Sequence, residues 1–216
     1  MSDLPRLKIT EIFYSLQGEA LNVGLPTVFI RLTGCPLRCS YCDTAYAFSG
    51  GEWMDIEAII DELRQYKTSH VTVTGGEPLA QKACIGLLNQ LCNLGYDVSL
   101  ETSGAIPVDQ VDERVVKILD VKTPGSEEDS KNKIENFAFL NTGDQVKFVI
   151  CNETDYLWSR QFIEQHQLEN KCEILFSASN DELDATTLAD WVLRDRLKVR
   201  FQIQLHKYLW GDKAGV

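Results

Sequence analysis

The hydrophobic positions of this chain form short apolar runs separated by longer amphipathic stretches. The runs are rich in β-branched residues and end in turn-forming residues, a pattern typical of buried strands. In chain order they cover residues 27–33, 71–74, 98–102, 115–121, 146–150, 173–177 and 199–205. We predict a strand at each of them.

Between these runs, apolar residues recur at helical spacing. A first helix is expected to begin at Asp55, a suitable N-cap, and to continue to about residue 67. Its inward side would hold Ile56, Ile59, Ile60 and Leu63. A second helix would end at Gly95, a residue type common after helix ends. Its inward side would hold Leu87, Leu88, Leu91 and Leu94. Two further helices are predicted near 156–165 and 187–194.

Strands that alternate with helices favour an α/β fold with a parallel sheet. The 216 residues are short for a complete eight-fold barrel. We therefore predict a partial, open TIM-like barrel of about six parallel strands, with residues 1–216 as a single domain. In such sheets the reactive groups gather beyond the carboxyl ends of the strands. Residues 125–136 are polar and charged, so we expect a solvated excursion there.

Composition and charge narrow the range of partners. The formal net charge is −11 and no run of Lys or Arg occurs, which argues against a nucleic-acid ligand. No apolar stretch of about 18 residues is present and the first residues lack a signal-peptide core, so a soluble, cytoplasmic protein without membrane contact is expected. Seven cysteines, an odd count, argue for reduced thiols rather than a disulfide framework.

Three of those cysteines lie within eight residues, at the end of a predicted strand. Cys35, Cys39 and Cys42 have the spacing C-x3-C-x2-C. Three thiolates can bind three corners of a 4Fe-4S cluster and leave the fourth iron open to chelate the amino and carboxylate groups of a methionine moiety. The alternatives are a structural zinc site, completed by His70, His166 or His206, and plain structural or redox-active thiols.

Two further loops follow predicted strands. Gly75-Gly76-Glu77-Pro78 combines glycines that let the backbone approach a ligand with a carboxylate that can accept from an ammonium group. Glu101-Thr102-Ser103-Gly104 offers hydroxyls suited to a ribose. Taken alone, each segment can equally be an ordinary turn. Their position on the same edge as the cysteine loop favours a functional interpretation.

Several polar residues have two interpretations from sequence alone. Gln17, Glu19 and Arg31 form a set able to bind a heteroaromatic ring with a carboxylate, but such residues are also common on surfaces. Lys122 and Lys147 stand at predicted strand ends, where a solvated face is the default. The aromatic and basic tail, residues 206–211, either closes a pocket or packs against the core.

The cysteine loop followed by Asp43-Thr44, together with Gly75-Gly76-Glu77-Pro78, resembles the radical S-adenosylmethionine superfamily. Within it, the chain resembles the 7-carboxy-7-deazaguanine synthase family over nearly its whole length. The motifs that carry this second resemblance are Glu11-Ile12-Phe13, Leu16-Gln17-Gly18-Glu19, Arg31, Glu101-Thr102-Ser103-Gly104 and Gln204-Leu205-His206-Lys207. Ala20 stands where the family usually has glycine, and Asp120-Val121-Lys122 where many members read Ser-Pro-Lys.

The resemblance implies conversion of 6-carboxy-5,6,7,8-tetrahydropterin to 7-carboxy-7-deazaguanine with loss of ammonia, on the route to queuosine. The reaction would start when a 5′-deoxyadenosyl radical takes hydrogen from C6 of the pterin. Implied cofactors are a 4Fe-4S cluster on Cys35, Cys39 and Cys42, S-adenosylmethionine, and Mg²⁺ on Thr44. Implied partners are a second copy in a homodimer and a flavodoxin- or ferredoxin-type electron donor.

The resemblance also assigns the two binding sites residue by residue. S-adenosylmethionine would be bound by Tyr41, Cys42, Asp43, Gly76, Glu77, Ser103, Lys122, Phe176, Ser177, Ala178 and Ser179. The pterin would be bound by Leu16, Gln17, Gly18, Glu19, Arg31 and Thr74. Two other functions stay open: an activase of the same superfamily that abstracts hydrogen from a glycine of a partner protein, and a non-enzymatic zinc or redox-thiol module.

Overall fold

The computed structural model describes residues 5–216, which form one nine-stranded sheet flanked by helices. The sheet order is β3-β1-β2-β4-β5-β6-β7-β8-β9. The strands are β1 (Arg6–Leu16), β2 (Pro26–Leu32), β3 (Glu52–Asp55), β4 (His70–Gly75), β5 (Asp97–Thr102), β6 (Val116–Val121), β7 (Gln145–Ile150), β8 (Glu173–Ala178) and β9 (Arg200–Gln202).

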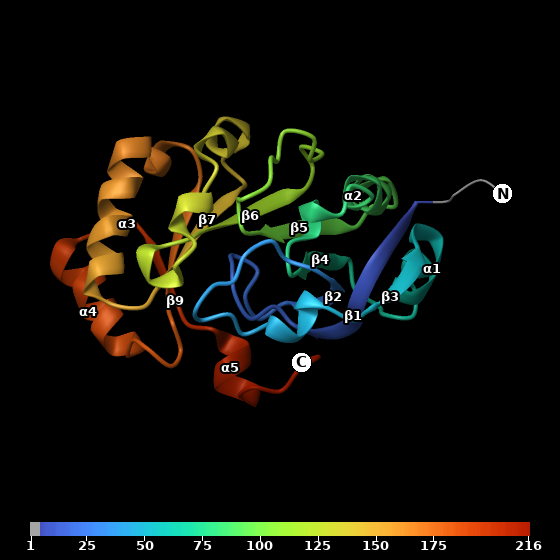
Figure 1. Ribbon diagram of the computed structural model, residues 1–216, viewed down its shortest axis with the longest axis horizontal. Coiled ribbons are helices and arrows are strands. Elements are labelled where there is room, and N and C mark those ends of the chain that lie inside the picture. The colour runs from blue at the N-terminus through green and yellow to red at the C-terminus, as the bar shows by residue number, and fades with distance from the viewer. Residues whose placement is uncertain (1–4) are drawn as a thin grey trace.

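Four α-helices connect the parallel strands and a fifth follows the last one. They are α1 (Ile56–Leu63), α2 (Cys84–Asn93), α3 (Glu153–His166), α4 (Ala185–Asp195) and α5 (Leu205–Trp210). Short 3-10 helices cover Ala45–Phe48, Pro78–Ala80, Pro124–Ser126, Asp129–Lys131, Ile134–Phe139 and Leu168–Asn170. Figure 1 shows α1 to α4 along the outer side of the curved sheet, with α5 near the C-terminus. Among residues 5–216, no helix is long and apolar enough to cross a membrane.

The parallel part of the sheet runs from β2 to β9 and confirms the predicted α/β class with an open sheet. It has one parallel strand more than the six predicted. Two strands were not predicted at all: β1 pairs antiparallel with β2 and, on its other side, with β3. The alternation of β1 is interrupted by a bulge between Ile9 and Glu11, and β3 has only four residues, none of them buried, so pairing with neighbours rather than a local pattern fixes both strands.

The two faces of the sheet differ in chemistry because side chains alternate along each strand. Val73, Leu100 and Phe148 belong to the main core between the sheet and the helices. The opposite face is mostly polar and includes Thr72, Ser99, Glu101, Gln145, Lys147 and Gln202. A small second cluster of Ala20, Ile118 and Leu175 lies on this inner face, where the loop after β1 packs. The open barrel therefore offers a polar inner surface.

Several details differ from the sequence-based expectations. Asp55 precedes α1 but its side chain accepts no capping hydrogen bond, and it pairs with Arg6 instead. Leu94 is 52% exposed rather than buried, although Gly95 ends the helix as predicted with φ of +85°. The last predicted strand, 199–205, is wrong beyond residue 202, because Leu205 begins α5.

The two lysines assigned to a solvated face are buried. Lys122 and Lys147 are each 8% exposed, since both extend along the polar inner face toward carboxylates. The excursion at residues 125–136 is also only partly solvated. Ser126 and Asn136 are buried, and the Asn136 amide donates hydrogen bonds to the backbone oxygens of Gly104 and of Ile106.

Candidate active site

The cysteine loop leaves the carboxyl end of β2 and lies at the rim of the parallel sheet. Cys35, Cys39 and Cys42 are free and partly exposed. Burial raises the pKa of Cys35 and of Cys42, and it raises the pKa of Cys39 to about 11, whereas the nearby charge of Lys122 acts in the opposite direction on all three. Metal binding at these sulfurs must therefore displace protons.

The glycine pair after β4 packs directly against the cysteine loop. Gly75 has φ of +139°, and a Cβ on Gly76 would lie 2.2 Å from the backbone oxygen of Gly34 and 3.0 Å from Cβ of Cys35. The Glu77 amide donates to the oxygen of Gly34 at 2.8 Å. These contacts require glycine at 76 and fix the start of the cysteine loop against β4.

Glu77 is fully buried and joins two of the suspected loops. Its carboxylate accepts hydrogen bonds from the Thr102 hydroxyl at 2.9 Å, the Ser103 amide at 2.8 Å and the Ser103 hydroxyl at 2.5 Å. It also accepts from the Leu79 amide at 3.0 Å. With 0% of its surface exposed, Glu77 braces the loops after β4 and β5 and stands behind the surface that a ligand would contact.

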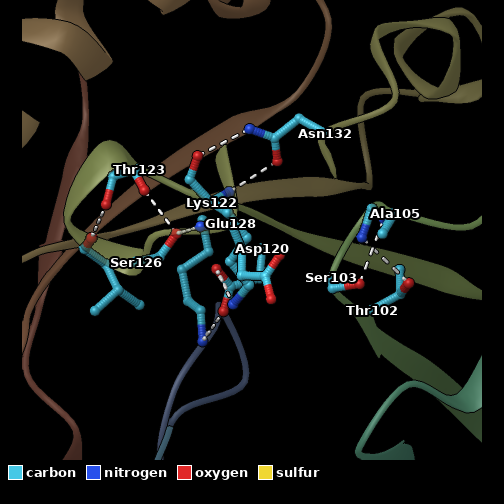
Figure 2. A network of polar contacts seen from close by, with 12 residues as sticks. Thr102, Ser103, Ala105, Asp120, Lys122, Thr123, Ser126, Glu128 and Asn132 are labelled. Carbon is cyan, nitrogen blue, oxygen red and sulfur yellow. Dashed lines mark hydrogen bonds and ion pairs between the residues drawn. The ribbon is translucent and has the colours of Figure 1, made fainter. Parts of the chain in front are cut away.

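Lys122 extends from the end of β6 toward the cysteine loop. Its ammonium lies 5.6 Å from the ring centroid of Tyr41 and 3.1 Å from the Asp120 carboxylate. The backbone of Lys122 is anchored by Asn132, which accepts from its amide at 2.9 Å and donates to its oxygen at 2.8 Å. Figure 2 shows this pair beside Asp120, with Ser103 on the neighbouring loop.

Residues 176–179, the predicted binding segment at the end of β8, have side chains on both faces of the sheet. Phe176 and Ala178 belong to the main core on the helix side, so only their backbone atoms are available to a ligand. The Ser177 hydroxyl lies on the inner face, is buried, and has no hydrogen-bond partner within residues 5–216. The Ser179 amide donates to the oxygen of Ile150.

The loop after β1 crosses the inner face and places the predicted polar set there. Gln17 is 3% exposed and its amide donates to the Thr72 hydroxyl at 3.1 Å. Glu19 is 8% exposed; one carboxylate oxygen pairs with Lys147 at 2.5 Å, and the other has no partner in the described chain. These two residues are therefore buried, which favours the binding interpretation over the surface one. Leu16 ends β1 just before them.

Arg31 and Thr74 occupy neighbouring strands at the same level, where they pair in the β2–β4 register. The Arg31 guanidinium donates to Glu11 at 2.7 Å and lies over the rings of Phe13 and Tyr46. The Thr74 hydroxyl donates to Glu101 at 2.9 Å. Only one of the five N–H groups of Arg31 is used in this pair, which leaves donors for an anion.

The end of the chain joins this site through Gly18. A Cβ on Gly18 would lie 2.2 Å from Nδ1 of His206, and the Leu205 amide donates to the Gly18 oxygen at 2.9 Å. His206 also lies 3.9 Å from Asp43, whose other carboxylate oxygen accepts from the Thr44 hydroxyl at 2.6 Å. The tail therefore packs on the loop after β1 and reaches the cysteine loop.

Two residues of the inner face, Lys147 and Glu101, were not assigned to a binding site from sequence. Lys147 pairs with Glu19 and, at 3.2 Å, with Asp120. Glu101 is surrounded by Gln17, Thr74 and the charge of Lys147, and burial raises the pKa of its carboxyl. The sequence did contain a signal for both residues. Glu101 on β5 and Lys147 on β7 each occupy a position that alternates with core residues, so their side chains point away from the helices.

The donor set fits the cofactors that the motifs suggest. Within residues 5–216, no three His, Cys, Asp or Glu side chains lie close enough to surround one metal ion. A cubane cluster binds each thiolate at a different iron, so its three sulfurs lie further apart than the ligands of a single ion. The unpartnered buried oxygens of Glu19, Tyr41 and Ser177 offer hydrogen bonds to organic ligands. The Thr44 and Asp43 oxygens suit a hard cation.

Known proteins resemble this chain in both sequence and fold. The model of the Radical SAM superfamily matches residues 29–123. A 7-carboxy-7-deazaguanine synthase from Chlorobaculum tepidum is 45% identical over 99% of each chain, and one from Koribacter versatilis is 42% identical over 96% of this chain and 99% of its own. The crystal structure of QueE from Escherichia coli has a TM-score of 0.77 at 22% identity, covering 93% of this chain and 95% of that chain. With such identities over its full length, the chain belongs to the 7-carboxy-7-deazaguanine synthase family of the radical S-adenosylmethionine superfamily.

Proposed function

We propose that this protein is a radical S-adenosylmethionine lyase that converts 6-carboxy-5,6,7,8-tetrahydropterin to 7-carboxy-7-deazaguanine with loss of ammonia, a step toward queuosine. The observation that carries the proposal is the 45% identity to a named 7-carboxy-7-deazaguanine synthase over the full length of both chains. Three free thiols at the open rim of a polar inner face support it physically.

The cysteine loop would hold the 4Fe-4S cluster through Cys35, Cys39 and Cys42. When bound, the cluster supplies the electron that cleaves S-adenosylmethionine and leaves one iron free for the methionine end of that molecule. The loop would hold the three sulfurs apart and partly shielded from water. Gly76 contributes by letting the next loop approach Cys35 closely.

S-adenosylmethionine would lie between the cysteine loop and the ends of β4 to β8. Tyr41 and Asp43 would contact it from the cysteine loop, and Gly76 and Ser103 from the loops after β4 and β5. Lys122, the unpartnered hydroxyl of Ser177, and Ser179 would complete the contacts. Glu77 acts by holding the Ser103 loop in place, and Phe176 and Ala178 contribute backbone atoms only.

The pterin would lie deeper, on the inner face, beside the loop that contains Leu16 and Gly18. Gln17 and the unpartnered oxygen of Glu19 are suited to the amide and amine groups of a pterin ring, because a buried acceptor without a donor is costly until a ligand supplies one. The unused N–H groups of Arg31 are suited to the substrate carboxylate. Thr74 positions Glu101 at the same level.

Magnesium would bind at Thr44, next to the space for the substrate carboxylate. Mg²⁺ commonly takes only one or two protein ligands and completes its shell with water and substrate oxygens. The finding that the described residues contain no three-ligand cage is compatible with such a site. The ion would neutralise the substrate carboxylate and fix its orientation.

The electron donor and the assembly state belong to the proposal as well. Reductive cleavage of S-adenosylmethionine needs a low-potential one-electron donor, for which we propose a flavodoxin- or ferredoxin-type protein. We further propose a homodimer working in the cytoplasm. An activase that acts on a partner protein is not favoured, because the binding groups face inward on a buried polar surface.

The decisive experiment is anaerobic incubation of reconstituted protein with a reductant, S-adenosylmethionine, Mg²⁺ and carboxytetrahydropterin, followed by mass spectrometry. The deazaguanine product is expected. Release of 5′-deoxyadenosine without that product would reject the substrate while keeping the radical chemistry. Cys39→Ala should abolish S-adenosylmethionine cleavage, whereas Cys172→Ala, outside the loop, should retain it. Thr44→Ala should keep the cluster and weaken the response to Mg²⁺.

A further inference from the structure

We propose that Asp155, in the first turn of α3, is a positioning residue that fixes the Cys39 corner of the cysteine loop through the segment 123–128. The inference deepens the proposed function, because its consequence for the cluster rests on Cys39 being a ligand. Its structural part, an ordered cysteine loop, does not depend on any cofactor.

The residues on both sides of Cys39 are tied to this segment. The Ser40 amide donates to the oxygen of Ser126 at 3.1 Å, and its hydroxyl donates to the oxygen of Gly125 at 2.6 Å. On the other side of the cysteine, the Arg38 amide donates to the Glu128 carboxylate at 2.5 Å. Three hydrogen bonds therefore bracket a single thiol.

Asp155 holds the same segment from behind. Its carboxylate accepts from the Gly125 amide at 2.8 Å, the Thr123 hydroxyl at 3.0 Å and the Cys151 amide at 3.1 Å. Only 1% of Asp155 is exposed, and no Lys or Arg in the described chain pairs with it. A Cβ on Gly125 would lie 2.4 Å from this carboxylate, so the close approach depends on glycine.

The segment itself has little regular structure that would fix it otherwise. It contains one short 3-10 turn, Pro124–Ser126, and Glu127 adopts a left-handed φ of +63°. Inside it, the Ser126 hydroxyl donates to the oxygen of Thr123 and accepts from the Glu128 amide, as Figure 2 shows. Asp155 is thus the link between a regular helix and a loop that reaches Cys39.

This chain of contacts gives a physical role to a buried carboxylate that touches no ligand. A thiol on a flexible loop loses conformational freedom each time a cluster is bound, which weakens binding. Contacts that order the loop in advance remove part of that cost. Loss of Asp155 is therefore expected to loosen the loop around Cys39 before any iron is present.

The first test is amide hydrogen exchange of the full-length, metal-free protein. In Asp155→Asn, an amide group faces backbone donors that need acceptors, so the Arg38 and Ser40 amides should exchange about tenfold faster, as loss of about 1.4 kcal/mol of local protection would give. Asp184→Asn is the matched control, because Asp184 accepts from the Thr187 amide at the start of α4. Unchanged exchange at both amides in Asp155→Asn, or equal acceleration in the control, would overturn the proposal.

A second variant, Ser40→Ala, tests the same contacts from the side of the cysteine loop, whether or not Asp155→Asn folds. It removes one exposed contact and should broaden the electron paramagnetic resonance spectrum of the reconstituted, reduced protein and lower its iron content. An unchanged spectrum and iron content would overturn the proposal. If Asp155→Asn folds, these changes in Asp155→Asn/Ser40→Ala should be smaller than the sum of the single effects. Fully additive effects would overturn the proposed coupling. Absence of any cluster in the parent protein would instead reject the proposed function, while the exchange result would still decide the positioning role.

Discussion

Lys147, in the middle of β7, forms a buried ion pair at 2.5 Å with Glu19, which lies 128 residues earlier in the loop after β1. The same ammonium lies 3.2 Å from Asp120 on β6. One cation therefore fixes the loop after β1 to the inner face of the sheet. Its pKa is raised well above the usual value, because nearby carboxylates outweigh the effect of burial.

Removing this cation should strongly destabilise the protein. In Lys147→Met the Glu19 charge stays buried without its partner, so we expect a loss of about 3–5 kcal/mol in the free energy of unfolding. Lys198→Met, on an exposed side chain, should change it by less than about 0.5 kcal/mol. Urea denaturation measures both. Equal small effects would show that Glu19 relaxes into water.

The pH dependence of this pair follows from the raised pKa of Lys147. A cation whose pKa is raised on folding contributes stability below its unfolded pKa and loses it only as the pH rises through the folded value. The difference in stability between parent and Lys147→Met should therefore stay constant between about pH 6 and 9. A difference that shrinks within that range would contradict the assignment.

Glu77 should matter for stability rather than for a ligand contact. In Glu77→Gln, a neutral amide replaces a carboxylate that accepts from Thr102, Ser103 and Leu79, and we expect a loss of about 2–3 kcal/mol. Glu57→Gln, exposed on α1, is the control and should be close to neutral. Thermal unfolding monitored by circular dichroism gives the comparison.

Gly76 and Gly86 form a matched pair for the packing of the cysteine loop. A methyl group at Gly76 would collide with Gly34 and Cys35, so Gly76→Ala should displace the loop, cost about 1–3 kcal/mol and reduce iron incorporation. Gly86 lies in α2, where a Cβ would meet Ile56 at an ordinary 3.5 Å. Gly86→Ala should thus stabilise the protein by up to about 1 kcal/mol. Unfolding curves and iron content distinguish the two.

Glu101 should give stability a pH dependence opposite to that of an acid whose pKa is lowered on folding. Burial raises the pKa of its carboxyl, so its contribution to stability is present at low pH and is lost as the pH rises through the folded pKa. Glu101→Gln should therefore gain stability relative to the parent as the pH increases from about 4 to 7. Glu173→Gln, exposed at the start of β8, serves as the control. A gain of the same size in the control would refute the explanation.

Much of the fold follows from local patterns. The buried strands β4 to β8 and helices α1 to α4 have periodicities strong enough to locate them from sequence, within a few residues at their ends. Strand β1 and helix α5 do not, since β1 depends on pairing with β2 and β3, and α5 on its contact with Gly18. Ala20 illustrates the same limit: its φ of +66° explains why glycine suits this position, and no local pattern shows it.

The sequence by itself determined the parallel α/β class, the cysteine loop and the family, because strand and helix periods and closely spaced ligands are local properties. Only the tertiary structure decided that Lys147 and Lys122 are buried, that Glu77 braces two loops, and that Phe176 faces the helices. Each of these depends on contacts between residues far apart in the chain. The cost of burying a charge or leaving a hydrogen bond unmade is set by those distant partners, which no local pattern of residues records.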